Sequence, residues 1–205
     1  MNAFLAILLA YLLGSLSFGY LLGKKLRGVD VRRLGSGSSG ATNILRTLGT
    51  GPAIVVLLLD IGKGIAAVYL AGLFSENPVV IMLAGVAVVA GHNWPVLFGF
   101  KGGRGIATSM GVLLGLAPGV ILVAALCGVL VIAVTRYVSL GSIVGSILIP
   151  VLMVLFRLPP SYILFGTALC AFAVWRHKAN IRRLLNGTES KLGERVSTGK
   201  EGVQK

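Results

Sequence analysis

The chain has 205 residues, of which 56% are hydrophobic and 12% are charged, and its net charge is +13. An ordinary soluble domain is about 25% charged, so the composition excludes that class and indicates an integral membrane protein. Because only 6 residues are acidic, most two-carboxylate hydrolases and carboxylate metal sites are excluded as well. The 2 cysteines, Cys127 and Cys170, lie inside apolar runs, which is typical of small buried residues rather than of a disulfide or zinc framework.

Apolar runs, most of them close to the roughly 20 residues of a membrane span, recur along the whole chain. They cover residues 3–23, 52–74, 78–100, 105–134, 138–156 and 161–175. The fourth run is too long for one span, because its 30 residues would form a helix of about 45 Å. Pro118 and Gly119 lie in its middle and are typical helix breakers. We therefore expect this run to fold as two helices.

The distribution of basic residues predicts which loops face the cytoplasm. Lys and Arg dominate residues 24–51 and the tail from residue 176 onward, and such segments stay on the cytoplasmic side of a membrane. These two basic segments both fall on the cytoplasmic side only if the fourth apolar run is divided at 116–119. The sequence thus predicts an all-α polytopic membrane protein with seven transmembrane helices, its N-terminus outside and its C-terminus cytoplasmic. Basic loops beside a bilayer favour anionic lipid or a phosphorylated substrate over nucleic acid.

Residues 34–49, the glycine–serine segment, are richer in small residues than an ordinary loop. The GxGxxG pattern from Gly35 matches a dinucleotide fingerprint, but no strand precedes it and no acidic residue follows at the required distance. The segment also begins like a P-loop, yet Ala41 occupies the position of the phosphate lysine. A glycine–serine turn that leads into a short helix near Thr42 still predicts an anion site, with Arg46 as a charged donor. The alternative is a flexible linker.

Residues 90–108, the glycine-rich segment, place cations and glycines directly before another apolar helix. Flanking charge at a membrane would explain the cations but not the glycines, so we favour phosphate binding. The candidate phosphate-binding residues are Lys101, Gly102, Gly103, Arg104 and Gly105. His92 and Asn93 precede Pro95, which frees a backbone carbonyl. These two polar residues either satisfy a kink or contribute to the site.

Residues 175–194, the C-terminal segment, are basic and begin where the last apolar run ends. His177 and Asn180 are three positions apart and would share one helical face. The alternative is an ordinary membrane-surface helix. Inside the second apolar run, Asp60 and Lys63 are also three positions apart, and charges inside a membrane need a partner or a polar cavity. We expect an ion pair that also forms a wall of the polar site.

Together, the three segments resemble the bacterial acyl-phosphate:glycerol-3-phosphate acyltransferases, the PlsY family. The resemblance rests on the stretches GSGSSGATNILRTLG, GHNWPVLFGFKGGRGIAT and HKANIRRLLNGTESKLGE, in the same order and spacing. It covers residues 1–196, which we treat as a single transmembrane acyltransferase domain. Residues 197–205 form a polar tail that is either disordered or foreign to the native protein.

The resemblance implies an enzyme of the bacterial inner membrane whose active site faces the cytoplasm. It implies transfer of a fatty acyl group from acyl phosphate to the 1-hydroxyl of sn-glycerol 3-phosphate, which yields lysophosphatidic acid and phosphate. It implies no metal and no cofactor. The expected partners are the two substrates, acyl phosphate and glycerol 3-phosphate, and the lipid bilayer, with no nucleic acid and no stable protein partner.

Carried over position by position, the resemblance assigns the serines at 36, 38 and 39, Arg46, residues 101–105, His177 and Asn180 to the site, and the patterns described above add the other residues. The catalytic functions fall on Ser38, Arg46, His177 and Asn180. The substrate- and phosphate-binding residues are Ser36, Gly37, Ser39, Gly40, Thr42, Asn43, Lys63, His92, Asn93, Lys101, Gly102, Gly103, Arg104 and Gly105. The choice among the serines at 36, 38 and 39, and between Glu189 and Glu194, stays open.

The residues also constrain the chemistry. No carboxylate flanks either histidine at a local spacing, so we expect direct attack in a ternary complex rather than a serine acyl-enzyme. The proton acceptor is His177, His92 or a substrate phosphate oxygen. The H-x-x-x-x-D motif of other glycerolipid acyltransferases is absent, because Leu97 and Arg182 occupy its fifth positions. The alternative function is a membrane transporter for a phosphorylated small solute, although we find no internal repeat of the transporter kind.

Overall fold

The computed structural model describes residues 2–194, and every regular element in that range is helical, as the sequence predicts. The α-helices are α1 (Asn2–Gly14), α2 (Phe18–Arg27), α3 (Ala41–Thr47), α4 (Thr50–Phe74), α5 (Pro78–Asn93), α6 (Ile106–Leu116), α7 (Pro118–Thr135), α8 (Val138–Leu155), α9 (Pro160–Arg176) and α10 (Lys178–Leu185). Two 3₁₀ turns, η1 (Val31–Arg33) and η2 (Val96–Phe98), lie in the loops. The predicted tail, residues 197–205, is outside the described range.

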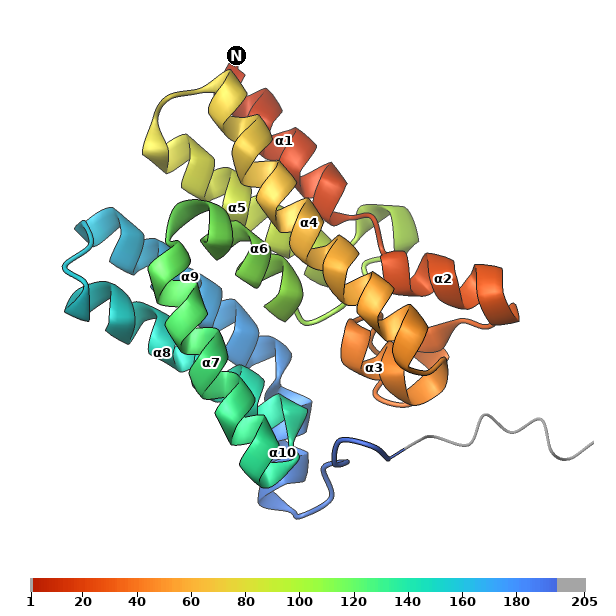
Figure 1. The fold of residues 1–205 in the computed structure, drawn as a ribbon. Coiled ribbons are helices and arrows are strands. Elements are labelled where there is room, and N and C mark those ends of the chain that lie inside the picture. Colours follow the sequence, from red (N-terminus) through yellow and green to blue (C-terminus); the bar gives the residue numbers. More distant parts are fainter. Residues whose placement is uncertain (1, 195–205) are drawn as a thin grey trace, which may run out of the picture.

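The first apolar run, predicted as one span over 3–23, is interrupted. Helix α1 ends at Gly14, and α2 leaves it at an angle after residues 15–17 (Figure 1). The backbone carbonyls that this break frees are satisfied from a distant helix, because Lys63 Nζ donates to Gly14 O at 3.1 Å and to Leu16 O at 2.9 Å. A break inside an apolar run needs such partners. The interruption therefore depends on a lysine that the local sequence does not reveal.

The break predicted inside the fourth run is confirmed. Helix α6 ends at Leu116 and α7 begins at Pro118. Proline suits the first position of a helix, because its missing N–H has no intrahelical partner there. The short helix predicted near Thr42 is also confirmed, since α3 begins at Ala41.

The helices form two groups that meet along one side (Figure 1). Helices α1, α4, α5 and α6 pack against one another, and α7, α8 and α9 form the second group. Contacts of α6 with α7 and of α5 with α9 join the groups, and the larger apolar core continues through both. A second, smaller core lies under α3 and consists of Val31, Ile44, Leu48, Ala53 and Val56. This smaller core anchors the glycine–serine segment on α4.

By length and composition, 5 helical stretches can cross a membrane. They are Ala3–Arg27, Thr50–Phe74, Pro78–Phe98, Pro118–Thr135 and Val138–Leu155. Helix α6 has 11 residues and α9 has 17, so both are shorter than these stretches. The structure thus agrees with a polytopic membrane protein, while the count of seven spans and their orientation stay predictions.

Candidate active site

The three segments singled out in the sequence converge on one cavity of about 420 Å³ between the two helix groups. That volume is within the range of small-molecule sites. Of the residues predicted for the site, those that line the cavity are Ser36, Ser38, Gly40, Thr42, Asn43, Arg46, His92, Arg104, Gly105 and His177. Those outside its wall are Gly37, Ser39, Lys63, Asn93, Lys101, Gly102, Gly103 and Asn180. The second set mostly supports the first.

Asn43 organises the glycine–serine segment. Its side-chain amide donates to the carbonyls of Val31, Leu34 and Ser38, and its Oδ1 accepts from the Ser36 N–H at 2.9 Å. All four contacts hold backbone, so Asn43 fixes the loop that presents Ser36 and Ser38 to the cavity. The Ser38 hydroxyl accepts from the Gly40 N–H at 3.2 Å and can still donate its own proton.

Arg46 and Arg104 bring two positive charges to the cavity wall. Arg46 extends from α3, is 9% exposed, and donates from Nη2 to the Ser190 carbonyl at 3.0 Å. Arg104 makes no hydrogen bond or ion pair with any of residues 2–194. Burial lowers the pKa of Arg104 to about 10, and neighbouring Arg183 adds to this effect while Glu189 opposes it. The group is still charged at neutral pH, and a half-buried cation without a partner among residues 2–194 is a candidate binding site for an anion.

The glycines of residues 101–105 allow close approach to the end of α5. A Cβ at Gly102 would lie 2.0 Å from the His92 carbonyl oxygen, and one at Gly103 would lie 1.9 Å from His92 Nε2. From the other side, Arg176 donates twice to the Gly103 carbonyl, at 2.7 and 3.1 Å. Gly105 has φ +82° and directly precedes α6, whose first N–H groups have no intrahelical acceptor. These contacts orient Arg104 and the start of α6 toward the cavity.

Lys101 lies outside this arrangement. Its side chain is exposed, and its carbonyl accepts a 3.3 Å hydrogen bond from Arg32 Nη1. The same Arg32 nitrogen donates to the Phe98 carbonyl at 2.6 Å, while its Nε pairs with Asp30 at 2.9 Å. The sequence did not distinguish Lys101 from Arg104. The structure places Arg104 in the cavity wall, and Lys101 on the outer side of the loop.

Asp60, Lys63 and His92 form a buried polar cluster below the glycine-rich segment. The predicted ion pair between Asp60 and Lys63 is present, with 2.8 Å between Oδ1 and Nζ. Lys63 Nζ also lies 2.9 Å from His92 Nδ1, and because an ammonium can only donate, this ring nitrogen accepts the hydrogen bond. Asp60 and His92 line the cavity, whereas Lys63 is behind them. Because Lys63 occupies the lone pair of Nδ1, His92 is a poorer proton acceptor than His177.

His177 connects α9 to α10 and is 2% exposed. Its Nδ1 lies 2.7 Å from the Ala173 carbonyl and must donate to it, which leaves the lone pair on Nε2. Burial lowers the pKa of His177 to about 4, although the hydrogen bond to Ala173 opposes the shift. At neutral pH the ring is therefore neutral, of defined tautomer, and able to accept a proton from a group in the cavity.

Glu189 joins the C-terminal segment to the second helix group. Its Oε1 accepts from Ser139 Oγ at 2.8 Å and from Asn180 Nδ2 at 2.6 Å, and its Oε2 accepts from Arg183 Nε at 2.6 Å. Burial alone would raise the pKa of Glu189, but these three hydrogen bonds hold it below the ordinary value. Of the two glutamates left open by the sequence, Glu189 lines the cavity and Glu194 does not. Glu194 accepts from the Lys191 N–H instead.

Several residues of the site escaped the sequence analysis. Ser139 begins α8 and supports Glu189, Arg176 ends α9 and holds the glycine-rich segment, and Arg32 ties both loops together. Each acts across a large sequence separation, and none has a distinctive local pattern. Asn180 was expected to act on substrate, but it reaches only Glu189 in this structure. Within residues 2–194, no group of three His, Cys, Asp or Glu side chains could hold a metal ion.

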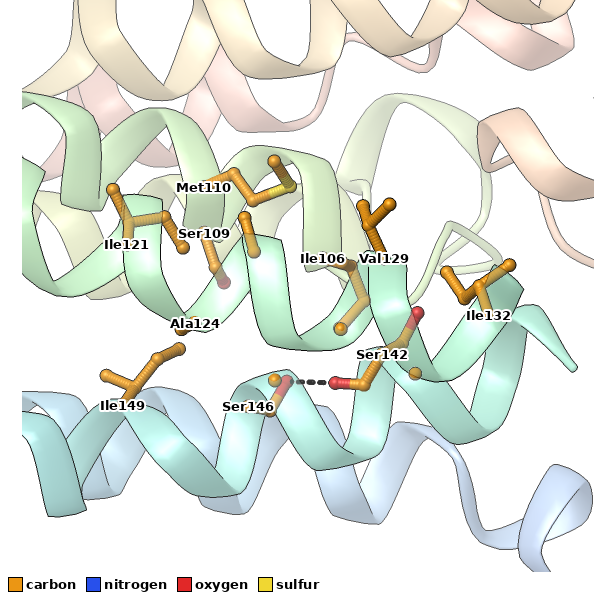
Figure 2. Close-up of a pocket in the computed structure, with 14 residues that line it drawn as sticks. Ile106, Ser109, Met110, Ile121, Ala124, Val129, Ile132, Ser142, Ser146 and Ile149 are labelled. Carbon is orange, nitrogen blue, oxygen red and sulfur yellow. Dashed lines mark hydrogen bonds between the residues drawn. The ribbon is translucent and has the colours of Figure 1, made fainter. Parts of the chain in front are cut away.

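An apolar groove continues from the cavity between α6, α7 and α8 (Figure 2). The groove and the cavity share Ile106, Met110, Val129, Ile132 and Ser142. Figure 2 shows aliphatic side chains from all three helices directed toward its interior. The polar cavity and this groove thus form one continuous site, with charge at one end and hydrocarbon along the rest.

A cationic cavity joined to an apolar groove, among helices apolar enough to cross a membrane, is typical of membrane proteins that act on amphiphilic anions. Residues 4–187 match the family model described as "Glycerol-3-phosphate acyltransferase". The chain is 47% identical to the glycerol-3-phosphate acyltransferase of Shouchella clausii, over 92% of this chain and 95% of the relative. It is 48% identical to that of Synechococcus sp., over 95% of this chain and 98% of the relative.

The fold is likewise similar to the crystal structure of PlsY (YgiH), an integral membrane glycerol 3-phosphate acyltransferase, in its glycerol 3-phosphate form. The TM-score is 0.89 at 39% identity, over 94% of this chain and 96% of that one. Its lysphosphatidic acid form gives a TM-score of 0.86 at 38% identity. The chain belongs to the PlsY family of glycerol-3-phosphate acyltransferases.

Proposed function

We propose that this protein transfers a fatty acyl group from acyl phosphate to the 1-hydroxyl of glycerol 3-phosphate, giving lysophosphatidic acid and phosphate. The family, which is named for acylation of glycerol 3-phosphate, supports the acceptor. The observation that carries the donor is Arg104, which lines the cavity without a partner among residues 2–194, together with the apolar groove that shares five lining residues with this cavity. Acyl phosphate has the matching chemistry, since it joins a phosphate to a long hydrocarbon chain.

The two arginines and the first N–H groups of α6 bind the substrate phosphates in this proposal. Arg104 is the stronger candidate, because it has no other partner within residues 2–194, whereas Arg46 already donates to Ser190. The Ser36 N–H is occupied by Asn43, so the segment contributes its hydroxyls, above all that of Ser38. The two arginines offset at least about half of the charge of roughly −3 to −4 that two phosphate groups bring to the site.

The acyl transfer itself is direct in this proposal. The glycerol hydroxyl oxygen attacks the carbonyl carbon of acyl phosphate, its proton passes to His177 Nε2 or to a phosphate oxygen, and phosphate leaves. Acyl phosphate is an activated mixed anhydride, so a weak base is sufficient. Positioning of the two substrates and stabilisation of the carbonyl oxygen by Ser38 and neighbouring N–H groups supply most of the acceleration. Asn180 acts through Glu189, to which it donates.

The proposal places the enzyme in the bacterial inner membrane with seven spans and with the cavity facing the cytoplasm. The two helices that fall short of the usual length, α6 and α9, then cross the membrane among longer neighbours. The positive loops support this orientation. The transporter alternative is not favoured, because the chain belongs to an acyltransferase family over nearly its whole length.

A donor comparison tests the proposal. Purified protein in detergent or vesicles receives radiolabelled glycerol 3-phosphate with palmitoyl phosphate, palmitoyl-CoA or palmitoyl-acyl carrier protein in parallel. We expect labelled lysophosphatidic acid from the acyl phosphate alone. Equal or faster transfer from either thioester would refute the donor assignment while leaving the acceptor intact. Transfer from none of them would refute the function.

A further inference from the structure

The groove runs along α7 from its cytoplasm-directed end toward the break before Pro118. Ile132 lies where the groove meets the cavity, and Ile121 lies at the opposite end (Figure 2). These residues are eleven positions apart, which corresponds to roughly 16 Å of helix. An extended hydrocarbon advances by roughly 1.25 Å per carbon, as follows from a bond of about 1.5 Å. A chain that enters at Ile132 therefore reaches Ile121 after about thirteen carbons.

Small residues form the part of the groove where α7 and α8 are in contact. Helices α7 and α8 touch through backbone here, because a Cβ at Gly141 would lie 2.4 Å from the Gly128 carbonyl oxygen. A Cβ at Gly145 would lie 3.1 Å from the Ala124 carbonyl oxygen. These close contacts place small residues along the α7–α8 seam, where the groove lies. Ser142 and Ser146 donate their hydroxyl protons to carbonyls of their own helix, so neither presents a free donor to the groove.

The far end of the groove is closed by two large aliphatic side chains. Ile121 is 4% exposed and Ile149 is 5% exposed, and they extend toward the groove from α7 and α8 (Figure 2). Both belong to the larger apolar core, together with Leu152 and Met153 of α8. Leu152 and Met153 follow Ile149 along α8 and are themselves buried. The lining of the groove therefore ends, in this direction, at side chains of the buried core.

We propose that Ile121 and Ile149 form an end wall that sets the longest acyl chain the enzyme transfers efficiently. This inference rests on the proposed function, since it assigns the groove to the acyl chain of the donor. Continuity with the cavity that contains Arg104 fixes the orientation, with the phosphate at the arginine and the terminal methyl group at the wall. Ala124 lies one helical turn nearer the cavity and forms part of the same path.

The test measures kcat/KM for saturated acyl phosphates of twelve to twenty carbons at saturating glycerol 3-phosphate. Ile121→Ala and Ile149→Ala remove the wall, and each should raise the eighteen-to-fourteen-carbon ratio by at least about tenfold, since each newly buried CH₂ contributes about fourfold. Ala124→Leu moves the obstruction roughly 4.5 Å toward the cavity. It should lower the same ratio by at least about tenfold and favour chains three to four carbons shorter.

Leu122→Ala is the matched control, because Leu122 neighbours Ile121 but is 62% exposed on the outer face of α7. Its chain-length profile should equal that of the unmodified protein. Each ratio is measured within one preparation, so partial misfolding of a variant cancels. Unchanged profiles in both Ile121→Ala and Ala124→Leu would overturn the end wall while the proposed function stands. Absence of transfer by the unmodified protein would overturn both.

Discussion

At the residue scale, the position of Arg104 in the cavity wall leads to a prediction about substrate binding. A charge-assisted hydrogen bond contributes about 1.5–3 kcal/mol, so Arg104→Ala should raise KM for one of the phosphorylated substrates roughly 10- to 150-fold. Lys101→Ala is the matched control, because the same loop carries this exposed cation outside the cavity. Steady-state kinetics with each substrate varied in turn measure the two KM values. Equal effects of the two substitutions would mean that general loop charge, rather than the cavity arginine, binds phosphate.

The lowered pKa of His177 leads to a prediction about the pH dependence of kcat. Its pKa in the folded protein is about 4, so it stays neutral and able to accept a proton throughout the range from pH 5 to 8. We expect the titration of His177 to leave kcat unchanged over this range and to lower kcat only as the pH approaches about 4. We also expect His177→Ala to lower kcat at least tenfold with a modest change in KM. A fall in kcat centred near pH 6.5 would contradict the buried, neutral imidazole.

The same histidine links folding to pH. Its folded pKa lies below the ordinary 6.5, so the unfolded chain binds more protons between these values. The stability contributed by the neutral ring is therefore complete above about pH 6.5 and is lost as the pH falls toward 4. Glu189 adds a loss at lower pH, because its depressed pKa stabilises the fold only while the carboxylate is ionised.

At the element scale, Glu189 attaches the C-terminal segment to α8 and α10. Glu189→Ala would leave Ser139 and Asn180 without their acceptor, and we expect the fold to lose about 1–3 kcal/mol of stability. The loss of the ion pair adds little to this figure, because Arg183 is partly exposed to solvent. Thermal unfolding in detergent measures this as a lower Tm. Glu194→Ala, which removes a single exposed contact to Lys191, is the control and should change the Tm little. A similar Tm for both variants would show that the segment is not held by Glu189.

The sequence predicted those helix boundaries that are determined by residues next to them in the chain. Pro118 marks the start of α7, and the small residues before Ala41 mark the start of α3. The break after Gly14 was not predictable, since the lysine that satisfies its carbonyls is 49 positions away. The site divides in the same way. Residue type and spacing located the three segments, but only the fold shows that Arg104 faces the cavity and that Lys101 does not. Only the fold shows, too, that Ser139 supports Glu189 and that Arg176 holds the Gly103 carbonyl.

At the scale of the whole molecule, the topology is open to a direct test. In a background without Cys127 and Cys170, single cysteines at positions 75 and 119 should react with a membrane-impermeant reagent from the same, outer side. A cysteine at position 136 should react only from the cytoplasmic side. If positions 75 and 119 label from opposite sides, α6 and α7 do not cross as two separate spans, and the seven-span arrangement is wrong.

The central claim is that the two substrates react directly while both occupy one cavity. Initial rates of lysophosphatidic acid formation, with acyl phosphate and glycerol 3-phosphate varied together, test this claim most directly. We predict intersecting double-reciprocal lines, and no acylated protein by mass spectrometry when acyl phosphate is supplied alone. Parallel lines, together with an acyl group trapped on Ser36, Ser38 or Ser39, would contradict direct transfer.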